Sequence, residues 1–275
     1  MASSPSVAES AGMWNLDNVT AILGCTTDTI QLRSGDEDHT SEDTDEDDFQ
    51  TEKSETTYKT FRASVQKELL CYFSPYYRAA LKGGFSEAAS KSVVLELDPM
   101  VCCMLVGWLY SGKLPKWIEW AQILSLYVFA DRTDMLALRR AIMTRIVHFE
   151  VGDRIPRFEV AAIALNSLPS TSPLYRWLLN AYIHHWMADY ETLDNTLPNW
   201  FLVDWVRGAA ARKCEVTEDD CGRCPCCEYN ACNYHEHENT EEWKSTCFAA
   251  KGCKAKRPDN AFLVVNSNIK DRDPR

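Results

Sequence analysis

The fold of this chain is decided by the stretch SVQKELLCYFSPYYRAALKGGFSE, residues 64 to 87. Its apolar side chains recur at helical spacing, at Leu69, Leu70, Phe73, Tyr77 and Leu81. Ser74 and Pro75 interrupt this pattern as an N-cap followed by proline at the first helical position, which predicts two successive helices. We expect Gly83 and Gly84 to end the second helix, because glycine readily adopts the left-handed conformation found at helix ends.

Strands are predicted on both sides of this stretch. Residues 28–33 alternate apolar and polar side chains, as a half-buried strand does, and residues 58–65 and 92–97 supply a second and a third strand. Asp98 and Pro99 repeat the cap before a helix that we expect to end at Gly112. The remaining helices are predicted at 117–130, 134–147, 156–166, 172–187 and 198–211. This order predicts an α+β fold with a small sheet covered by helices on one side.

Residues 64–87, together with VLELD at 94–98 and GWLYSG at 107–112, resemble the BTB/POZ family in a form like that of filamentous-fungal proteins. The resemblance covers about residues 28–148. It implies the BTB/POZ fold and a non-enzymatic module for protein–protein interaction, with a second copy of the chain or a cullin as partner. The family usually has His-Lys-Asp where this chain has Gln66, Lys67 and Glu68.

The resemblance also singles out a short motif after the second helix. Family members that bridge substrates to cullin ubiquitin ligases carry an apolar residue, any residue and then a glutamate there. Phe85 and Glu87 fit this pattern. They are therefore candidate interaction residues of a substrate adaptor for a cullin-type ubiquitin ligase. The alternative is that Phe85 packs in the core and Glu87 is solvated.

An acidic block interrupts the first two predicted strands. Residues 36 to 55 contain eleven Asp and Glu against one Lys, whereas the whole chain has a net charge of -11. We expect residues 34–57 to form a disordered insertion within a domain at 28–148, because such a sequence buries too little to offset its ordering entropy. The rest of the chain is nearly neutral, which argues against a large nucleic-acid-binding face.

The C-terminal part is rich in metal-ligating side chains. Eight of the twelve cysteines fall between Cys214 and Cys253, and two-residue gaps let paired ligands reach one ion. We predict a structural zinc site with the candidate ligands Cys221, Cys224, Cys227, Cys232, His235 and His237. The alternative is a loop of reduced, unliganded thiols. The other four cysteines, which are Cys25, Cys71, Cys102 and Cys103, are assigned to the core.

The regions around the predicted domain follow from these patterns. We expect a mostly flexible N-terminus at 1–27, a helical extension at 149–211, the Cys/His-rich zinc-binding segment at 212–257 and a flexible tail at 258–275. Within the extension, we expect one of His184 and His185 to be packed and the other exposed.

The sequence lacks the motifs of several other function classes. No catalytic motif is found, so no enzyme is expected. GWLYSGK at 107–113 lacks the Ser or Thr of a phosphate-binding loop. No secretory signal or membrane span is recognised, which predicts a cytoplasmic and/or nuclear location. The alternative function is a nuclear transcription regulator whose Cys/His segment, with the basic stretch 251–257, contacts nucleic acid.

Overall fold

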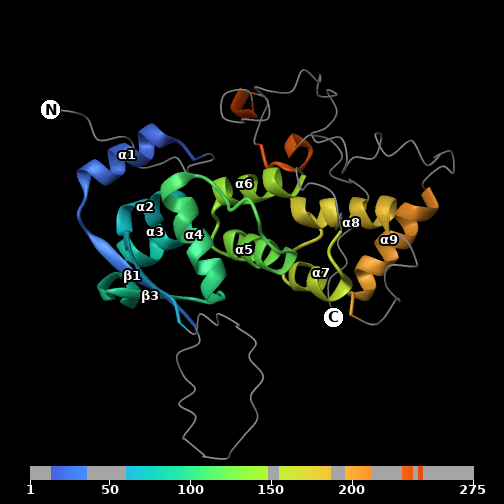
Figure 1. Cartoon of the computed structure of the whole chain (residues 1–275), viewed down its shortest axis with the longest axis horizontal. Coiled ribbons are helices and arrows are strands. Elements are labelled where there is room, and N and C mark those ends of the chain that lie inside the picture. The colour runs from blue at the N-terminus through green and yellow to red at the C-terminus, as the bar shows by residue number, and fades with distance from the viewer. Residues whose placement is uncertain are drawn as a thin grey trace, which may run out of the picture.

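A computed structural model of the chain describes residues 14–35, 60–147, 155–186, 196–211, 231–237 and 241–243. The fold is α+β, as predicted (Figure 1). The first part consists of α1 (Leu16–Cys25), β1 (Thr29–Ser34), β2 (Arg62–Gln66), α2 (Lys67–Phe73), α3 (Pro75–Lys82), the 3-10 helix η1 (Ser86–Ala89), β3 (Ser92–Leu95) and α4 (Pro99–Ser111). The second consists of α5 (Trp120–Arg132), α6 (Leu136–Val147), α7 (Phe158–Leu165), α8 (Pro173–His185), α9 (Asn199–Ala211) and the 3-10 helix η3 (Ala231–Tyr234).

The sheet has three strands in the order β2-β1-β3. β1 and β2 are antiparallel, with Ile30 opposite Val65, and β1 and β3 are parallel, with Leu32 opposite Val93. A parallel neighbour requires a crossover connection, which α2, α3 and η1 supply. Ile30 and Leu32 are buried and alternate with the exposed Gln31, so the half-buried strand predicted at 28–33 is confirmed. β3 ends at Leu95, two residues before its predicted end.

The predicted caps begin the helices where expected. The Ser74 hydroxyl accepts from the Tyr77 backbone N–H at 3.1 Å and donates to the Thr133 carbonyl at 2.6 Å. Asp98 likewise accepts from the Met100 N–H at 2.8 Å, and Gly112 ends α4 in the left-handed region at φ 66°. Gly83 ends α3 at φ -77° and ψ -172°, which is extended backbone, so the expected left-handed end is wrong there.

The N-terminal region contains a helix that was not predicted. Residues 1–27 were expected to be mostly flexible, but α1 is formed and is capped by Asn15. The Trp14 indole N–H donates to the Leu109 carbonyl at 3.0 Å, and Val19 is buried. A single buried residue in α1 leaves too weak a periodicity to reveal the helix in the sequence. Residues 1–13 lie outside the described residues.

The helices after the sheet-bearing part stack along the long axis of the molecule, with α7, α8 and α9 at the far end (Figure 1). α7 packs on α5, and an aromatic cluster fills the space between α7, α8 and α9. The rings of Phe158 and Tyr182 lie 5.6 Å apart, and Trp205 lies 5.3 Å from Tyr182. His184 and His185 are both half-buried, so the expectation of one packed and one exposed ring is wrong. Both lie in the last turn of α8, where the buried face of the helix ends at Tyr182.

The four cysteines assigned to the core divide into two pairs. Cys71 and Cys102 are buried, whereas Cys25 and Cys103 are exposed, so the core assignment is wrong for that second pair. Cys25 ends α1, and Cys103 lies on the outer side of α4 next to the buried Cys102. Apolar neighbours in sequence do not decide which helix face a thiol occupies. In the part of the chain that the structure describes, no helix has the length and apolar character of a membrane span.

Candidate metal centre

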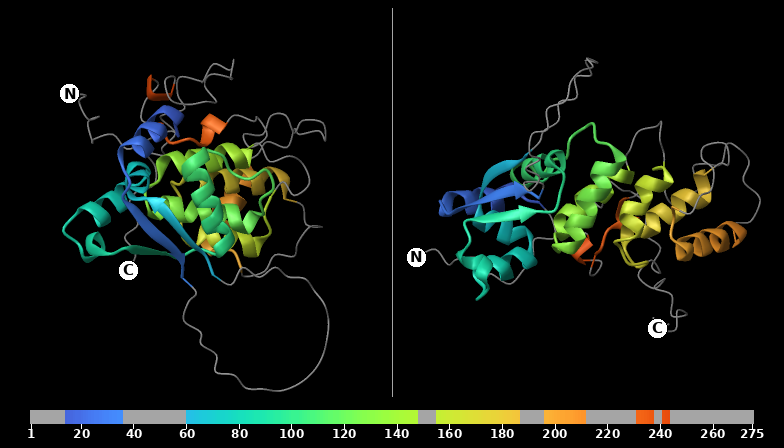
Figure 2. Two further views of the ribbon diagram at one scale, coloured as in Figure 1. Left: turned by 60° about the vertical axis from the view of Figure 1, so that its left-hand side comes forward. Right: turned by 90° about the horizontal axis from the view of Figure 1, so that it is seen from below.

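A short C-terminal segment lies across two helices that are distant from it in sequence. Residues 231–237 and 241–243 are called the strap below, and its helix η3 lies beside α6 and α8 (Figure 2). Tyr234 is only 3% exposed, and its hydroxyl accepts from the Asn180 amide at 3.1 Å. This aromatic side chain anchors the strap to the helical core.

The strap brings together three of the six predicted metal ligands. Cys232, His235 and His237 are all buried, and their candidate ligand atoms lie within 4.8 Å of one another. The two imidazole rings lie 5.4 Å apart. One thiol and two imidazoles form a donor set suited to zinc and related transition metals. This buried group can therefore hold a metal ion.

His237 has a buried ring nitrogen that is suited to binding a metal ion. Its Nδ1 lies 2.9 Å from the Glu242 Oε2, so Nδ1 carries the proton that this carboxylate accepts. The Nε2 atom then carries the lone pair, and it is buried without a hydrogen-bond partner. Burying an imidazole nitrogen in this way is unfavourable unless something binds it. A metal ion at the cluster meets that need.

The other two ligands are oriented by neighbours in the same manner. The Thr144 hydroxyl donates to the Arg140 carbonyl at 2.9 Å, and so it accepts from the His235 Nε2 at 2.9 Å. This assigns the lone pair of His235 to Nδ1. The Trp243 indole N–H donates to the Cys232 Sγ at 2.9 Å, which holds the sulfur in place. Such outer hydrogen bonds hold ligands in the orientation that a metal requires.

Two arginines of α6, Arg139 and Arg140, also bind the strap. Arg139 forms a bidentate pair with Glu236, at 2.7 Å from Nε to Oε2 and 3.2 Å from Nη2 to Oε1. Arg140 donates from Nη1 to the Glu242 Oε1 at 2.7 Å, and from Nη2 to the Glu236 carbonyl. Burial lowers the pKa of Arg139, but the hydrogen bond and the charge of Glu236 outweigh it and raise the pKa above its ordinary value.

The predicted site residues have different outcomes. Cys232, His235 and His237 come together, whereas Cys221, Cys224, Cys227 and the basic stretch 251–257 lie outside the described residues. Phe85 is 63% exposed, so the alternative that it packs in the core is wrong, and Glu87 is exposed as well. Sequence reasoning missed Arg139, Arg140 and Thr144, because their type and spacing on a helix are as common on solvated faces.

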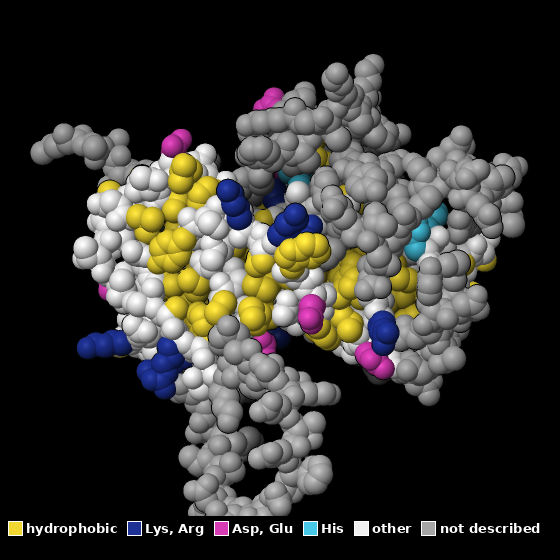
Figure 3. Space-filling model, in the orientation of Figure 1, with side chains coloured by type: hydrophobic (Ala, Val, Ile, Leu, Met, Phe, Trp, Pro, Cys, Tyr) yellow, Lys and Arg dark blue, Asp and Glu magenta, His cyan; other side chains and the backbone are white. Residues whose placement is uncertain are grey.

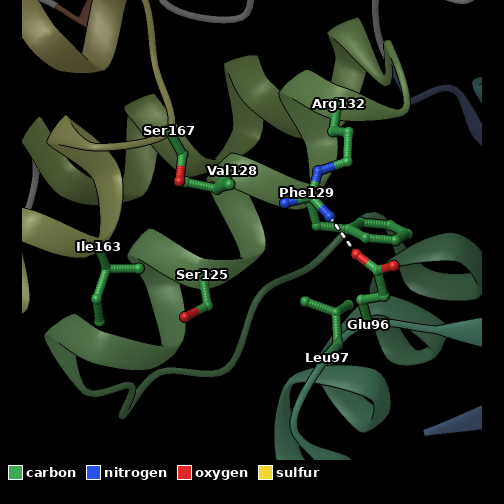
Figure 4. A pocket seen from close by; sticks show the side chains of 8 residues that line it. All are labelled: Glu96, Leu97, Ser125, Val128, Phe129, Arg132, Ile163 and Ser167. Atoms are coloured by element: carbon green, nitrogen blue, oxygen red, sulfur yellow. Dashed lines mark hydrogen bonds and ion pairs between the residues drawn. The ribbon is translucent and has the colours of Figure 1, made fainter. Parts of the chain in front are cut away.

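A shallow pocket of about 190 Å³ lies between the end of β3, α5 and α7 (Figure 4). Arg132 crosses its mouth to pair with Glu96 at 2.5 Å. The pocket is lined by Glu96, Leu97, Ser125, Val128, Phe129, Arg132, Ile163 and Ser167. It is smaller than the ~300–1,000 Å³ of ordinary small-molecule sites. Its lining contains two serines, Ser125 and Ser167, but no histidine that could act as a base for either of them.

No model of a known protein family matches this chain, and a search of curated proteins found no match either.

Proposed function

We propose that residues 28–148 form a BTB/POZ-type domain that binds other proteins in the cytoplasm and/or nucleus and that catalyses no reaction. The proposal is supported by the order of the elements: a hairpin, two helices, a third strand parallel to the first, and then three helices. This order agrees with the one predicted from the periodicity of the sequence. The departure at 66–68 is accommodated, because Tyr110 donates to the Gln66 side chain and Lys82 pairs with Glu68.

The observation that carries the proposal is the exposure of Phe85. Large hydrophobic side chains reach the surface at the sheet-bearing end, as Figure 3 shows, and those of α1 to α4 that are exposed are Leu16, Tyr76, Phe85, Val94 and Met100. Exposed apolar groups of this size favour a protein contact. A Cβ on Gly83 would lie 2.3 Å from the Ala79 carbonyl oxygen and 3.1 Å from the Phe85 ring, so glycine permits the turn that projects Phe85.

We propose a cullin as the partner at this surface, because Phe85 and Glu87 stand directly after α3 and match the adaptor motif. The test is calorimetric titration of the chain with the N-terminal domain of a cullin. Phe85→Ala should weaken binding by about tenfold or more, as removal of an aromatic anchor does. Val206→Ala is the matched control, since Val206 is 67% exposed on α9 at the other end of the molecule.

The outcomes of this titration are distinct. Equal binding by the Phe85→Ala and Val206→Ala variants would contradict the assigned surface. Absence of binding by the unchanged chain would contradict the cullin as partner. Sedimentation analysis of the chain alone then tests the second expected partner, which is another copy of the chain. A dimer that Phe85→Ala leaves intact would place self-association elsewhere.

We further propose that the metal held by Cys232, His235 and His237 is a structural zinc. Three protein ligands leave one tetrahedral position, for which Cys221, Cys224 and Cys227 are the candidates from the sequence. Metal analysis of the purified chain should give about one zinc, and Cys232→Ser should lower that content sharply. A chain without zinc after purification in reducing buffer would support the alternative of unliganded thiols.

A further inference from the structure

Two adjacent guanidinium groups are buried on one side of α6. Arg139 is 8% exposed and Arg140 is 2% exposed. Neighbouring helical residues point about 100° apart, yet both side chains end on the strap. A buried arginine is strongly unfavourable unless carboxylates bind it. Arg139 has local acidic partners as well, with Asp134 at 3.3 Å and Asp131 at 4.0 Å, but its bidentate contact comes from the strap. The surface of α6 is therefore suited to a segment that carries more than one acidic group.

The strap meets this requirement with two glutamates. Glu236 binds Arg139 through both carboxylate oxygens, a geometry that selects a carboxylate over other acceptors. Glu242 binds Arg140 through Oε1 and the metal ligand His237 through Oε2. One carboxylate thus joins the arginine pair to the candidate metal centre. Metal binding by the strap and its binding to the arginines are therefore coupled through Glu242.

We propose that Arg139 and Arg140 form a binding site for acidic peptides, and that the strap is its intramolecular occupant, locked in place by the metal. The strap also defines the chemistry of a competing partner. It has an aromatic residue, Tyr234, two positions before Glu236, and Glu242, which binds Arg140, follows six positions after Glu236. A partner segment with this arrangement reproduces both the aromatic anchor beside Asn180 and the two ion pairs.

The lock rests on the proposed zinc, because metal binding fixes the strap only if Cys232, His235 and His237 are ligands. Metal-binding free energy at such a site is also free energy of ordering the segment. Without the ion, the hold on α6 and α8 comes from ion pairs and the Tyr234 contact alone. These are contacts that a peptide of the same chemistry offers equally well.

The binding site is tested on the full chain carrying Glu236→Gln and Glu242→Gln, which keeps the shape of the strap but removes the two charges that bind the arginines. The probe is a fluorescent peptide with the sequence ACNYHEHENTEEW, residues 231–243. Fluorescence polarisation should show this peptide binding about tenfold or more tightly than a peptide with the same two glutamines. Arg139→Gln in the host chain should reduce that difference, because only the pair of Arg140 with Glu242 then remains, and Arg139→Gln together with Arg140→Gln should abolish it. Circular dichroism confirms that every host is folded.

Equal affinity of the acidic and the glutamine peptide would overturn the carboxylate-binding site, and so would failure of both to bind. The lock is tested separately by hydrogen exchange of residues 231–237 in the unchanged chain, before and after chelation. Protection should fall by about tenfold or more once the metal is removed. Unchanged protection in a sample shown to have lost zinc would overturn the lock. A sample that never contained zinc would instead contradict the proposed metal, while the peptide measurement would still decide the arginine site.

Discussion

His237 and Glu242 are joined by one hydrogen bond, 2.9 Å from Nδ1 to Oε2, and this bond decides which nitrogen of the imidazole faces the cluster. With Nδ1 protonated, the lone pair lies on Nε2, which is buried and otherwise has no hydrogen-bond partner. When a carboxylate accepts a hydrogen bond from one ring nitrogen of a histidine, it fixes the orientation of the ring. It also makes the other nitrogen a stronger ligand for a metal. Glu242 therefore belongs to the candidate metal centre although it does not ligate.

Glu242→Gln should weaken zinc binding by about 10- to 100-fold, because the amide no longer holds His237 through a charged hydrogen bond. The measurement is competition against a chromophoric chelator with the reduced chain. Glu241→Gln is the matched control, since Glu241 is the exposed neighbour of the same type and should leave the affinity unchanged. Similar losses from both variants would mean that the overall charge of the strap, and not this bond, governs binding.

Ser74→Ala should lower the free energy of unfolding by about 2–3 kcal/mol, since it removes the cap of α3 and leaves the buried Thr133 carbonyl without its donor. Urea denaturation measures the change. Ser111→Ala is the control, because the Ser111 hydroxyl is exposed and bonds only locally to the Gly107 carbonyl at 2.6 Å and to Lys113. That variant should stay within about 0.5 kcal/mol of the unchanged chain.

Gly112→Ala should destabilise the chain by about 2 kcal/mol or more, because φ is 66° there and an added Cβ would lie 2.4 Å from the Trp14 ring. Gly107→Ala is the internal comparison. It lies within α4 with nothing inside 4 Å of the added atom, so it should gain about 0.5–1 kcal/mol. Thermal unfolding of the two variants should shift in opposite directions. Equal shifts would contradict both the left-handed conformation of Gly112 and its contact with Trp14.

Burial raises the pKa of the Cys102 thiol to about 12, with smaller contributions from Cys103 and Asp98. At about pH 8 only roughly one in ten thousand Cys102 side chains is a thiolate, so iodoacetamide should spare it while it modifies the exposed Cys25. In the unfolded chain the same thiol ionises near its ordinary value of 9.0. Stability due to this group is therefore complete below pH 9.0 and falls as the pH rises toward 12.

Mass spectrometry of alkylated peptides checks the first expectation, and urea denaturation above pH 9.0 checks the second. Rapid modification of Cys102 in the folded chain would show that α4 opens readily. The exposed Cys103, on the neighbouring position of the same helix, provides a comparison within one peptide.

Much of the fold could be predicted from the sequence, because local chemistry determines it. The Ser74 and Asp98 caps, the positive φ of Gly112 and the alternation in β1 each rest on a few adjacent residues. α1 was missed because only Val19 is buried in it. The exposed positions of Cys25 and Cys103 were missed for a related reason, since a thiol on a helix gives no sign of which face it occupies.

The candidate metal centre could be predicted only in its ligand types. Cys232, His235 and His237 are close in sequence, so their spacing indicated a shared ion. Thr144 and Arg140 come from α6, about a hundred positions earlier, and their contacts with the strap depend on tertiary packing. No local pattern reveals such pairs, and so the carboxylate network around the centre became visible only with the fold.

The contact between Arg139 and Glu236 spans 97 positions of the chain. A ribosome adds about 5–20 residues per second, so α6 waits roughly 5–20 s for its acidic partners after it has been synthesised. During this interval α6 lacks the carboxylates of Glu236 and Glu242, and Arg139 has only closer neighbours in sequence, such as Asp134, to bind it. A segment translated about a hundred positions after α6 thus completes the middle of the protein.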